Sequence, residues 1–471
     1  MMRRVIVVLS LMVIPFSLVP AFSQEITKTE FSDMIAKEKI REYKHVLVLG
    51  VNQPFSKGYN KYSPLFFYGW FGDDFKNKDL YMQFTMTTTR IYFIAAMKTD
   101  KIFAGVKPLL EHSTYSAWKS YNRGYNDKFR EFGGNNAGAG VFFQYNWLRI
   151  LSTKATFHAS YHFYRLFLLA SNEHKYVNMP KRHWQLKPGI ELLLSDVREK
   201  SLARVKHGYL FRVEYQYARR IGYGTWYDYD RLWFREKLNN VWVPPTGTTE
   251  GLWYKSTVHA THRLYFNVGG YYNFDKDINL LMDFYGGYFK GVDRNNAEQI
   301  GYMQQDHAIM PGYASTEFMH NLYLISRLQI GFPIPFWDAR IQPGFNVMYM
   351  PKKNEVVGQG RGLYYYGRGA VLTDIVSGGK IAYHGYPKQV YKSVSCSFSL
   401  RLGNLLPLFI DYAYGIDAVR ASSAYKLYTS KLNKGCHELN VIIVMAFGSN
   451  VDKKEEETEA KKDDKKGGKN R

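Results

Sequence analysis

Cysteine and long apolar runs are both scarce in this chain. Its 471 residues include two cysteines, Cys396 within a segment of alternating polarity and Cys436 at the start of another. An oxidising compartment would allow them to pair, but these positions do not favour a disulfide and we expect none. After Gln24 no run reaches the roughly 18 apolar residues that a membrane-spanning helix needs. A helical membrane protein is therefore excluded.

The first 23 residues have the layout of a cleaved secretory signal. Two arginines precede an apolar stretch, residues 5–20, and the small-residue pattern AFS follows at residues 21–23. We expect cleavage before Gln24 and export of the mature chain. The alternative is a retained signal anchor, which Pro15 and Pro20 disfavour because they break the apolar core.

The remainder of the chain is rich in aromatic residues and glycine. Aromatic side chains make up 17% of the sequence, with 39 tyrosines and 31 phenylalanines, and glycine occurs 39 times. Hydrophobic residues reach 46%, yet they are dispersed rather than gathered in runs. An exported chain of this kind indicates a transmembrane β-barrel, whose apolar residues are spread by alternation along each strand.

A clear case of alternation is KATFHASYHFYRLF, residues 154–167. Ala155 and Phe157 fall on one face of a strand, whereas His158 and His162 fall on the other. A period of two indicates strands between two unlike environments, here lipid and a wet lumen. The same pattern recurs in residues 79–87, 209–220, 263–274 and 394–402.

The connections between these strands alternate between short and long. Short ones fall at residues 72–78, 151–154, 195–206, 275–277, 332–338 and 403–406. Long ones fall at residues 52–60, 98–140, 172–183, 219–257, 291–316, 351–390 and 420–435. Bacterial barrels have tight periplasmic turns and extended extracellular loops, so both chain ends are expected on the periplasmic side.

Fourteen strands result from this assignment. A hairpin within residues 368–385 would make sixteen, and residues 85–101 form either one long strand or two separated by a turn at Thr99-Asp100. We therefore predict an all-β fold, an antiparallel transmembrane β-barrel of about 14–16 strands with short periplasmic turns and long extracellular loops, over residues 43–448. A short periplasmic segment precedes it at residues 24–42, and a charged periplasmic tail at residues 449–471 is expected to be disordered.

The formal net charge of the sequence is +22. An excess of positive charge raises the local concentration of anions and steers anionic partners toward the protein. The alternative is that the lysines occupy loops and face anionic lipid headgroups. Both interpretations stay open.

Two arrangements of histidine are similar to catalytic or metal sites. His158-Ala159-Ser160 resembles the His-x-Ser pair of outer-membrane phospholipase A, but that pair faces the lipid boundary, whereas His158 and Ser160 are expected to face the lumen. His158 and His162 lie about 13 Å apart along a strand, which is too far for one ion. We therefore expect no enzyme activity, no metal and no cofactor.

Residues 358–362, GQGRG, and 401–417, RLGNLLPLFIDYAYGID, resemble the C-terminal barrel of the bacterial surface-antigen superfamily, which includes the outer-membrane assembly factor and two-partner secretion transporters. The resemblance implies an Arg-Gly-aromatic motif in a loop that folds into the lumen. Here Arg361 and Gly362 would occupy it, although Leu363 stands where the aromatic residue is expected. Members carry periplasmic POTRA modules, for which residues 24–42 leave no room, so a barrel-only member is implied.

These observations predict an integral outer-membrane barrel that acts as a passive, porin-like channel for small solutes, with anions favoured by the net charge. Charged rings in the lumen set the selectivity of such channels. The residues predicted to line the lumen are the cations Arg212, Arg263, Arg327 and Arg401 and the acids Glu214, Asp283 and Asp411. For each arginine the alternative is an ion pair between strands.

Two other functions stay open. A barrel-only relative of the surface-antigen superfamily, involved in outer-membrane protein assembly or export, would use the Arg361 loop and a weak seam between the first and last strands. A surface adhesion or structural barrel would use aromatic loop residues such as 222–234. The expected partners are outer-membrane lipids, the barrel assembly machinery during biogenesis and small solutes, with no nucleic acid; the oligomeric state does not follow from the sequence.

Overall fold

The computed structural model describes the chain in stretches that are separated by gaps. These stretches are residues 43–55, 63–72, 79–87, 90–112, 121–122, 125–126, 132–166, 180–200, 205–224, 226–229, 253–256, 259–274, 278–291, 298–300, 309–313, 318–320, 322–334, 339–350, 371–373, 380–382, 389–402, 406–420 and 433–449. Within them we find no helix with the length and apolarity that a membrane span requires.

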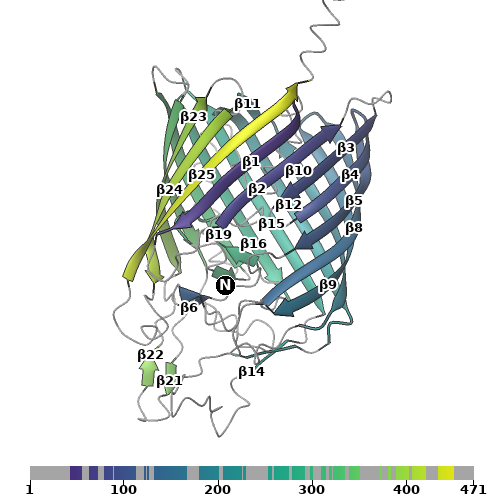
Figure 1. Ribbon diagram of the computed structural model, residues 1–471, viewed down its shortest axis with the longest axis vertical. Coiled ribbons are helices and arrows are strands. Elements are labelled where there is room, and N and C mark those ends of the chain that lie inside the picture. The colour runs from purple at the N-terminus through teal and green to yellow at the C-terminus, as the bar shows by residue number, and fades with distance from the viewer. Residues whose placement is uncertain are drawn as a thin grey trace, which may run out of the picture.

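Sixteen long antiparallel strands form one closed barrel, and they run obliquely to its axis (Figure 1). Each of these strands pairs with the next one along the chain, and the last pairs with the first. Their bounds are β1 Tyr43–Pro54, β2 Ser63–Gly72, β3 Leu80–Thr87, β4 Arg90–Lys98, β5 Ile102–His112, β8 Phe132–Leu148, β9 Leu151–Leu166, β10 His183–Ser195, β12 Val205–Ile221, β15 Ala260–Asn273, β16 Asn279–Lys290, β19 Leu322–Ile334, β20 Ala339–Tyr349, β23 Val390–Leu402, β24 Leu406–Arg420 and β25 Asn433–Ser449. The predicted all-β barrel of about 14–16 strands is confirmed at the upper count.

The described residues form nine further strands, all of them short. One of them, β11 (Arg198–Lys200), pairs with the start of β12 at the turn between β10 and β12. The others form two-stranded ribbons between the long strands. These are β6 Tyr121–Asn122 with β7 Tyr125–Asn126, β13 Trp226–Tyr229 with β14 Trp253–Ser256, β17 Glu298–Ile300 with β18 Phe318–His320, and β21 Val371–Thr373 with β22 Lys380–Ala382.

The seam between β1 and β25 closes the barrel. Eleven residue pairs join the two strands, from Tyr43 opposite Ser449 to Pro54 opposite Glu438. A chain in lipid has no water to satisfy its backbone N–H and C=O groups, so a barrel is stable only when it has no open edge. The seam provides that closure from one end of β1 to the other.

The two faces of the wall differ in polarity, as the alternation predicts. Along β3 the inward Tyr81, Gln83 and Thr85 are buried, whereas the outward residues between them are partly exposed. On β9, Phe157 is 43% exposed on the outer face, which places His158 and His162 on the inner face. Strand β9 therefore lies with lipid on one side and the lumen on the other.

The two strands beyond the fourteen come from a different segment than the one predicted. Residues 80–112 form three strands, β3, β4 and β5, and the alternative turn at Thr99-Asp100 is confirmed between β4 and β5. The backbone N–H of Thr99 donates to the carbonyl of Ile102 at 2.7 Å, and the Ile102 N–H donates to the Thr99 hydroxyl at 3.0 Å. The predicted hairpin within residues 368–385 does form as β21 and β22, but these pair only with each other and lie away from the wall (Figure 1).

Both cysteines are free thiols, in line with their positions in the sequence. Cys396 lies on the outer face of β23, as its place among outward residues predicts. Cys436 is buried near the start of β25.

Several predicted features lie outside the described residues. They are the signal at residues 1–23, the segment at residues 24–42, the tail beyond Ser449, residues 225 and 230–234 of the aromatic loop, and the loop with Arg361 and Gly362. These remain predictions from the sequence.

The alternation of faces on β9 makes a testable prediction. In a background with Cys396→Ala and Cys436→Ala, a cysteine at His158 or Ser160 is expected to react with a membrane-impermeant maleimide in the folded, membrane-inserted barrel, because both positions face water. A cysteine at Phe157 or Ala159 is expected not to react. Equal reactivity at all four positions would contradict the assigned faces.

Candidate functional site

The candidate site is the inner face of the barrel, which divides into two halves. On β16 to β25 the inward polar side chains are almost fully covered, as shown by Asp283 and Arg327, which are 2% and 3% exposed. On β5 to β12 the inward side chains of Lys107, Lys154 and Lys187 remain partly exposed. A solute inside the barrel therefore meets the β5 to β12 wall.

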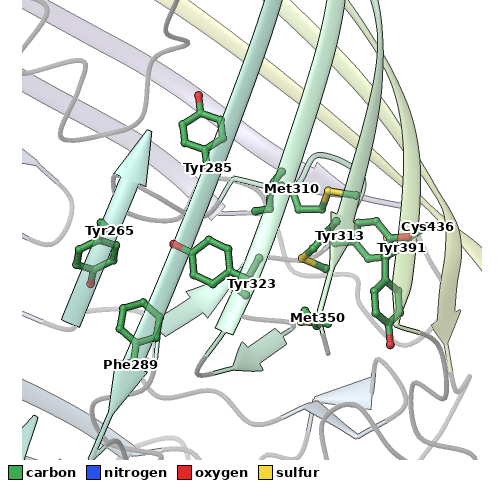
Figure 2. Packing of buried hydrophobic residues seen from close by; sticks show 12 residues of the cluster. Tyr265, Tyr285, Phe289, Met310, Tyr313, Tyr323, Met350, Tyr391 and Cys436 are labelled. Carbon is green, nitrogen blue, oxygen red and sulfur yellow. The ribbon is translucent and has the colours of Figure 1, made fainter. Parts of the chain in front are cut away.

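One short segment between β17 and β18, residues 309–313, covers part of the β23 to β25 wall. Its side chains join a buried cluster that also includes residues of β15, β16, β19, β23 and β25 (Figure 2). Met310 and Tyr313 have no exposed surface. Because this segment belongs to a long connection yet is buried inside the wall, we refer to it as the inward segment.

Hydrogen bonds fasten the inward segment to the wall. The Gly312 N–H donates to the Glu438 carboxylate on β25 at 3.1 Å, and the Tyr313 hydroxyl donates to the Lys392 carbonyl on β23 at 2.8 Å. Gly312 has a φ of 80°, which favours glycine. A Cβ there would also lie 2.5 Å from the Gly415 nitrogen, so the backbone approaches β24 too closely for any side chain.

Glu438 connects the inward segment to the barrel seam. Its carboxylate accepts a hydrogen bond from the Asn52 side-chain amide of β1 at 2.8 Å, and the same amide donates to Asn440 at 2.7 Å. Glu438 is 1% exposed, and a buried carboxylate requires such donors because desolvation is costly. One carboxylate thus contacts both strands of the seam and the inward segment.

The predicted arginines lie in two kinds of surroundings. Arg212 on β12 is held between two carboxylates, donating to Glu191 at 2.8 Å and to Glu214 at 3.0 Å. Arg327 on β19 is opposite Asp283 in the β16–β19 register, is influenced by the charge of Asp411, and donates to Asn346 at 3.4 Å. Ion pairing of Arg212 and burial of Arg327 reduce the field that either would exert on a solute.

The other predicted lumen residues lie on three different strands. Arg263 on β15 is partly exposed on the inner face and donates to the Tyr265 hydroxyl at 3.4 Å. Asp411 on β24 is inward and buried. The backbone of Arg401 pairs with Pro407, and its side chain lies outside the described residues. The structure therefore does not gather these residues into one ring.

A row that places lysines on either side of His158 on the β5 to β12 wall was missed by the sequence interpretation. In the strand register Lys107 is opposite Gly140, Gly140 is opposite His158, and His158 is opposite Lys187. The His158 imidazole occupies the space that a side chain at Gly140 would take. Lys154 lies on the same face, and the charges of all three lysines act on His158.

The alternation along the sequence contains the signal for one part of this row. Lys154 and His158 are separated by an even number of residues, so they share a face of β9. Lys107 and Lys187 required the register between strands, which spacing along the chain does not contain. Five cations face inward on β5, β9, β10 and β12 against three carboxylates among the described residues, namely Lys107, Lys154, Lys187, Arg212 and Arg220 against Glu111, Glu191 and Glu214.

Histidines and aromatic rings lie beyond this row, toward the long connections. The rings of His162 and His183 stack with centroids 5.0 Å apart, and Tyr223 meets His183 edge-on at 4.8 Å. Ser160 contacts the His162 ring at 3.0 Å rather than His158. Within the described part of the chain, no three His, Cys, Asp or Glu side chains are grouped so that they could hold a metal ion.

Comparison with known proteins gives a likeness of fold. No family model and no curated protein sequence matches the chain. Among solved structures, BamA from Haemophilus ducreyi lacking POTRA domains 1–3 is similar at 10% identity and a TM-score of 0.47, over 85% of this chain and 70% of that one. CdiB from Acinetobacter baumannii is similar at 9% identity and a TM-score of 0.46, over 85% and 60%. The expected outer-membrane barrel resembling the surface-antigen superfamily agrees with these neighbours in fold alone.

The packing of the inward segment makes a second prediction. In the same cysteine-free background, a cysteine at Met310 is expected to be unreactive to a water-soluble maleimide. Gly415→Ala is expected to make it reactive, because a methyl group there would meet the Gly312 carbonyl. The matched control is Gly189→Ala on β10, where the one contact of the added methyl under 3.0 Å is with the end of the Thr156 side chain, at 2.8 Å. Unchanged labelling with Gly415→Ala would contradict the close contact.

Proposed function

We propose that this barrel is an outer-membrane channel for small solutes that favours anions, and that the solute path follows the inner face of β5 to β12. The observation that carries the proposal is the partly exposed row in which Lys107 and Lys187 flank His158, with Lys154 on the same face. Lysines that face a lumen raise the local concentration of anions there.

The cations that carry this proposal are lysines, whereas the sequence analysis expected arginines to set the selectivity. Arg212 donates to two carboxylates, so that group of three side chains carries a net negative charge. In the lysine row, Lys107 lies over the Tyr92 ring, 4.2 Å from its nitrogen to the ring centroid, and Lys154 lies over the Phe142 ring at 5.7 Å. Contact with a neutral ring leaves the charge of a lysine in place. Anion preference is therefore assigned to the lysines.

The inward segment bears on the size of the solute. Residues 309–313 occupy space inside the wall of β23 to β25. A loop that folds into a barrel narrows the passage on its side, so the remaining path is suited to small solutes. The segment is held by hydrogen bonds and by close backbone contact, which favours a standing constriction.

Ion selectivity provides the test of this function. A charge about 10 Å from a passing ion contributes roughly 0.4 kcal/mol in bulk water and more at lower dielectric, with opposite sign for anions and cations. Replacing Lys107, Lys154 and Lys187 by glutamine is therefore expected to lower the anion-to-cation permeability ratio by about threefold or more. The measurement is the reversal potential of the refolded barrel in a planar bilayer under a salt gradient.

The control for that experiment is Lys101→Gln, which removes one lysine charge from an exposed turn away from the lumen. It is expected to leave the permeability ratio unchanged. A wild-type barrel without steady conductance, or a triple variant with unaltered selectivity, would contradict the proposed function.

A second function is supported by a separate observation. Glu438 contacts both the inward segment and Asn52 across the seam, so movement of the segment would alter the bonds that close the barrel. This coupling favours a barrel that opens at its seam, as expected for a protein involved in outer-membrane protein assembly or export.

Cross-linking of the seam distinguishes the two functions. Leu49 and Ile443 are paired across it, and both are outward, so Leu49→Cys with Ile443→Cys is expected to form a disulfide that holds the seam shut. If the barrel acts in assembly or export, the cross-link is expected to abolish that assembly or export in cells, and a reductant is expected to restore it. The conductance of the barrel is expected to stay unchanged. The control pair is Phe345→Cys with Val394→Cys between β20 and β23. Equal effects of both cross-links would exclude a role for seam opening.

A further inference from the structure

A cationic cluster lies on the outer wall of the barrel, where β12, β15 and β16 run side by side (Figure 1). His262 is directly opposite Lys290, and its other neighbour in register is Tyr217. Arg219 is two residues beyond Tyr217 on the same face, which puts it diagonally across from His262. Such neighbours have Cβ atoms about 5 Å apart when opposite and about 7–8 Å apart on the diagonal.

The cluster is exposed on a wall that carries few charges. Arg219, His262 and Lys290 are all exposed. Along the outward faces of β10, β12, β15 and β16, the described residues include no aspartate or glutamate. Arg219 and Lys290 flank His262 and both carry a positive charge, so an anion that lay between them would be attracted by both.

Tyrosines hold the central histidine in place. The Tyr215 hydroxyl lies 2.8 Å from Nδ1 of His262, and the Tyr217 ring is 5.1 Å from the His262 ring. When the Tyr215 hydroxyl donates to Nδ1, the proton of the imidazole is on Nε2. Nε2 can then donate to an oxygen atom of a ligand.

Aromatic residues fix the depth of the cluster in the membrane. Tyr215 on β12 and Tyr288 on β16 are outward and exposed. Tyrosine and tryptophan in such a belt lie at the level of the lipid headgroups. Arg219 and Lys290 follow the belt toward the long connections after β12 and β16, which is the extracellular end of the barrel.

We propose that Arg219, His262 and Lys290 form a binding site for a phosphorylated lipid headgroup of the outer leaflet. Three donors within reach of one another suit the oxygens of one phosphate group, and the apolar wall below them, including Leu264, suits the acyl chains of the same molecule. A lipid-borne phosphate fits better than a free one because the cluster opens to the membrane side of the wall. The site rests on the barrel crossing the membrane and is independent of the solute path.

Lipid retention by the full-length, refolded barrel tests this site. Native mass spectrometry would compare binding of diphosphorylated lipid A by wild type, by Arg219→Gln with Lys290→Gln, and by Lys392→Gln. Lys392 is a matched control because it is also exposed on the outer wall at the extracellular end, on β23 and away from the cluster. Since each basic residue near a membrane surface contributes substantially, the double variant is expected to bind roughly tenfold less, and the control within about twofold of wild type.

Three results would overturn the proposal. One is wild-type binding by the double variant, provided that its heat-dependent shift in electrophoretic mobility shows a folded barrel. Another is an equal loss with Lys392→Gln, which would indicate attraction by the overall charge. The third is displacement of the lipid by an equal concentration of inorganic phosphate, which would identify a site for free anions. Loss confined to the double variant, with little competition by phosphate, supports the site.

Discussion

Closure of the backbone hydrogen-bond network is the constraint on which the rest of this structure depends. In lipid, an unpaired N–H or C=O group costs several kcal/mol, so all sixteen strands must pair and the last must meet the first. The β1–β25 seam meets this requirement with eleven residue pairs. Once the wall is closed, each side chain of a strand faces either lipid or the lumen.

The lumen is asymmetric because one connection turns back into it. Gly312 and Gly415 allow two backbones to approach without side chains between them, and Glu438 accepts the Gly312 N–H. The same carboxylate accepts from Asn52. Aromatic packing around Tyr313 and Tyr391 completes the contact (Figure 2). The result is a covered half on β16 to β25 and a more open half on β5 to β12.

The electrostatic role of each cation depends on its neighbours more than on its type. Arg212 lies between Glu191 and Glu214, whereas Lys187 shares a row with His158 and Lys107. Arg219 and Lys290 face outward at the aromatic belt. Among the described residues, the cations are therefore divided among ion pairs, the open lumen wall and the outer surface.

The sequence by itself determined the class of fold and the facing of most strands, because alternation with a period of two is a local property of the chain. It placed His158 inward, Cys396 outward and Asp283 within the lumen. At residues 85–101 it left open one long strand or a turn at Thr99-Asp100, because β4 is apolar on both faces, and the structure has the turn, which uses the Thr99 hydroxyl. Only the tertiary structure decided which cations are neutralised, which connection enters the lumen and which lysines form a row. Those features depend on the register between strands, which brings together residues as distant in the chain as Asn52 and Glu438, and no spacing along the sequence encodes that register.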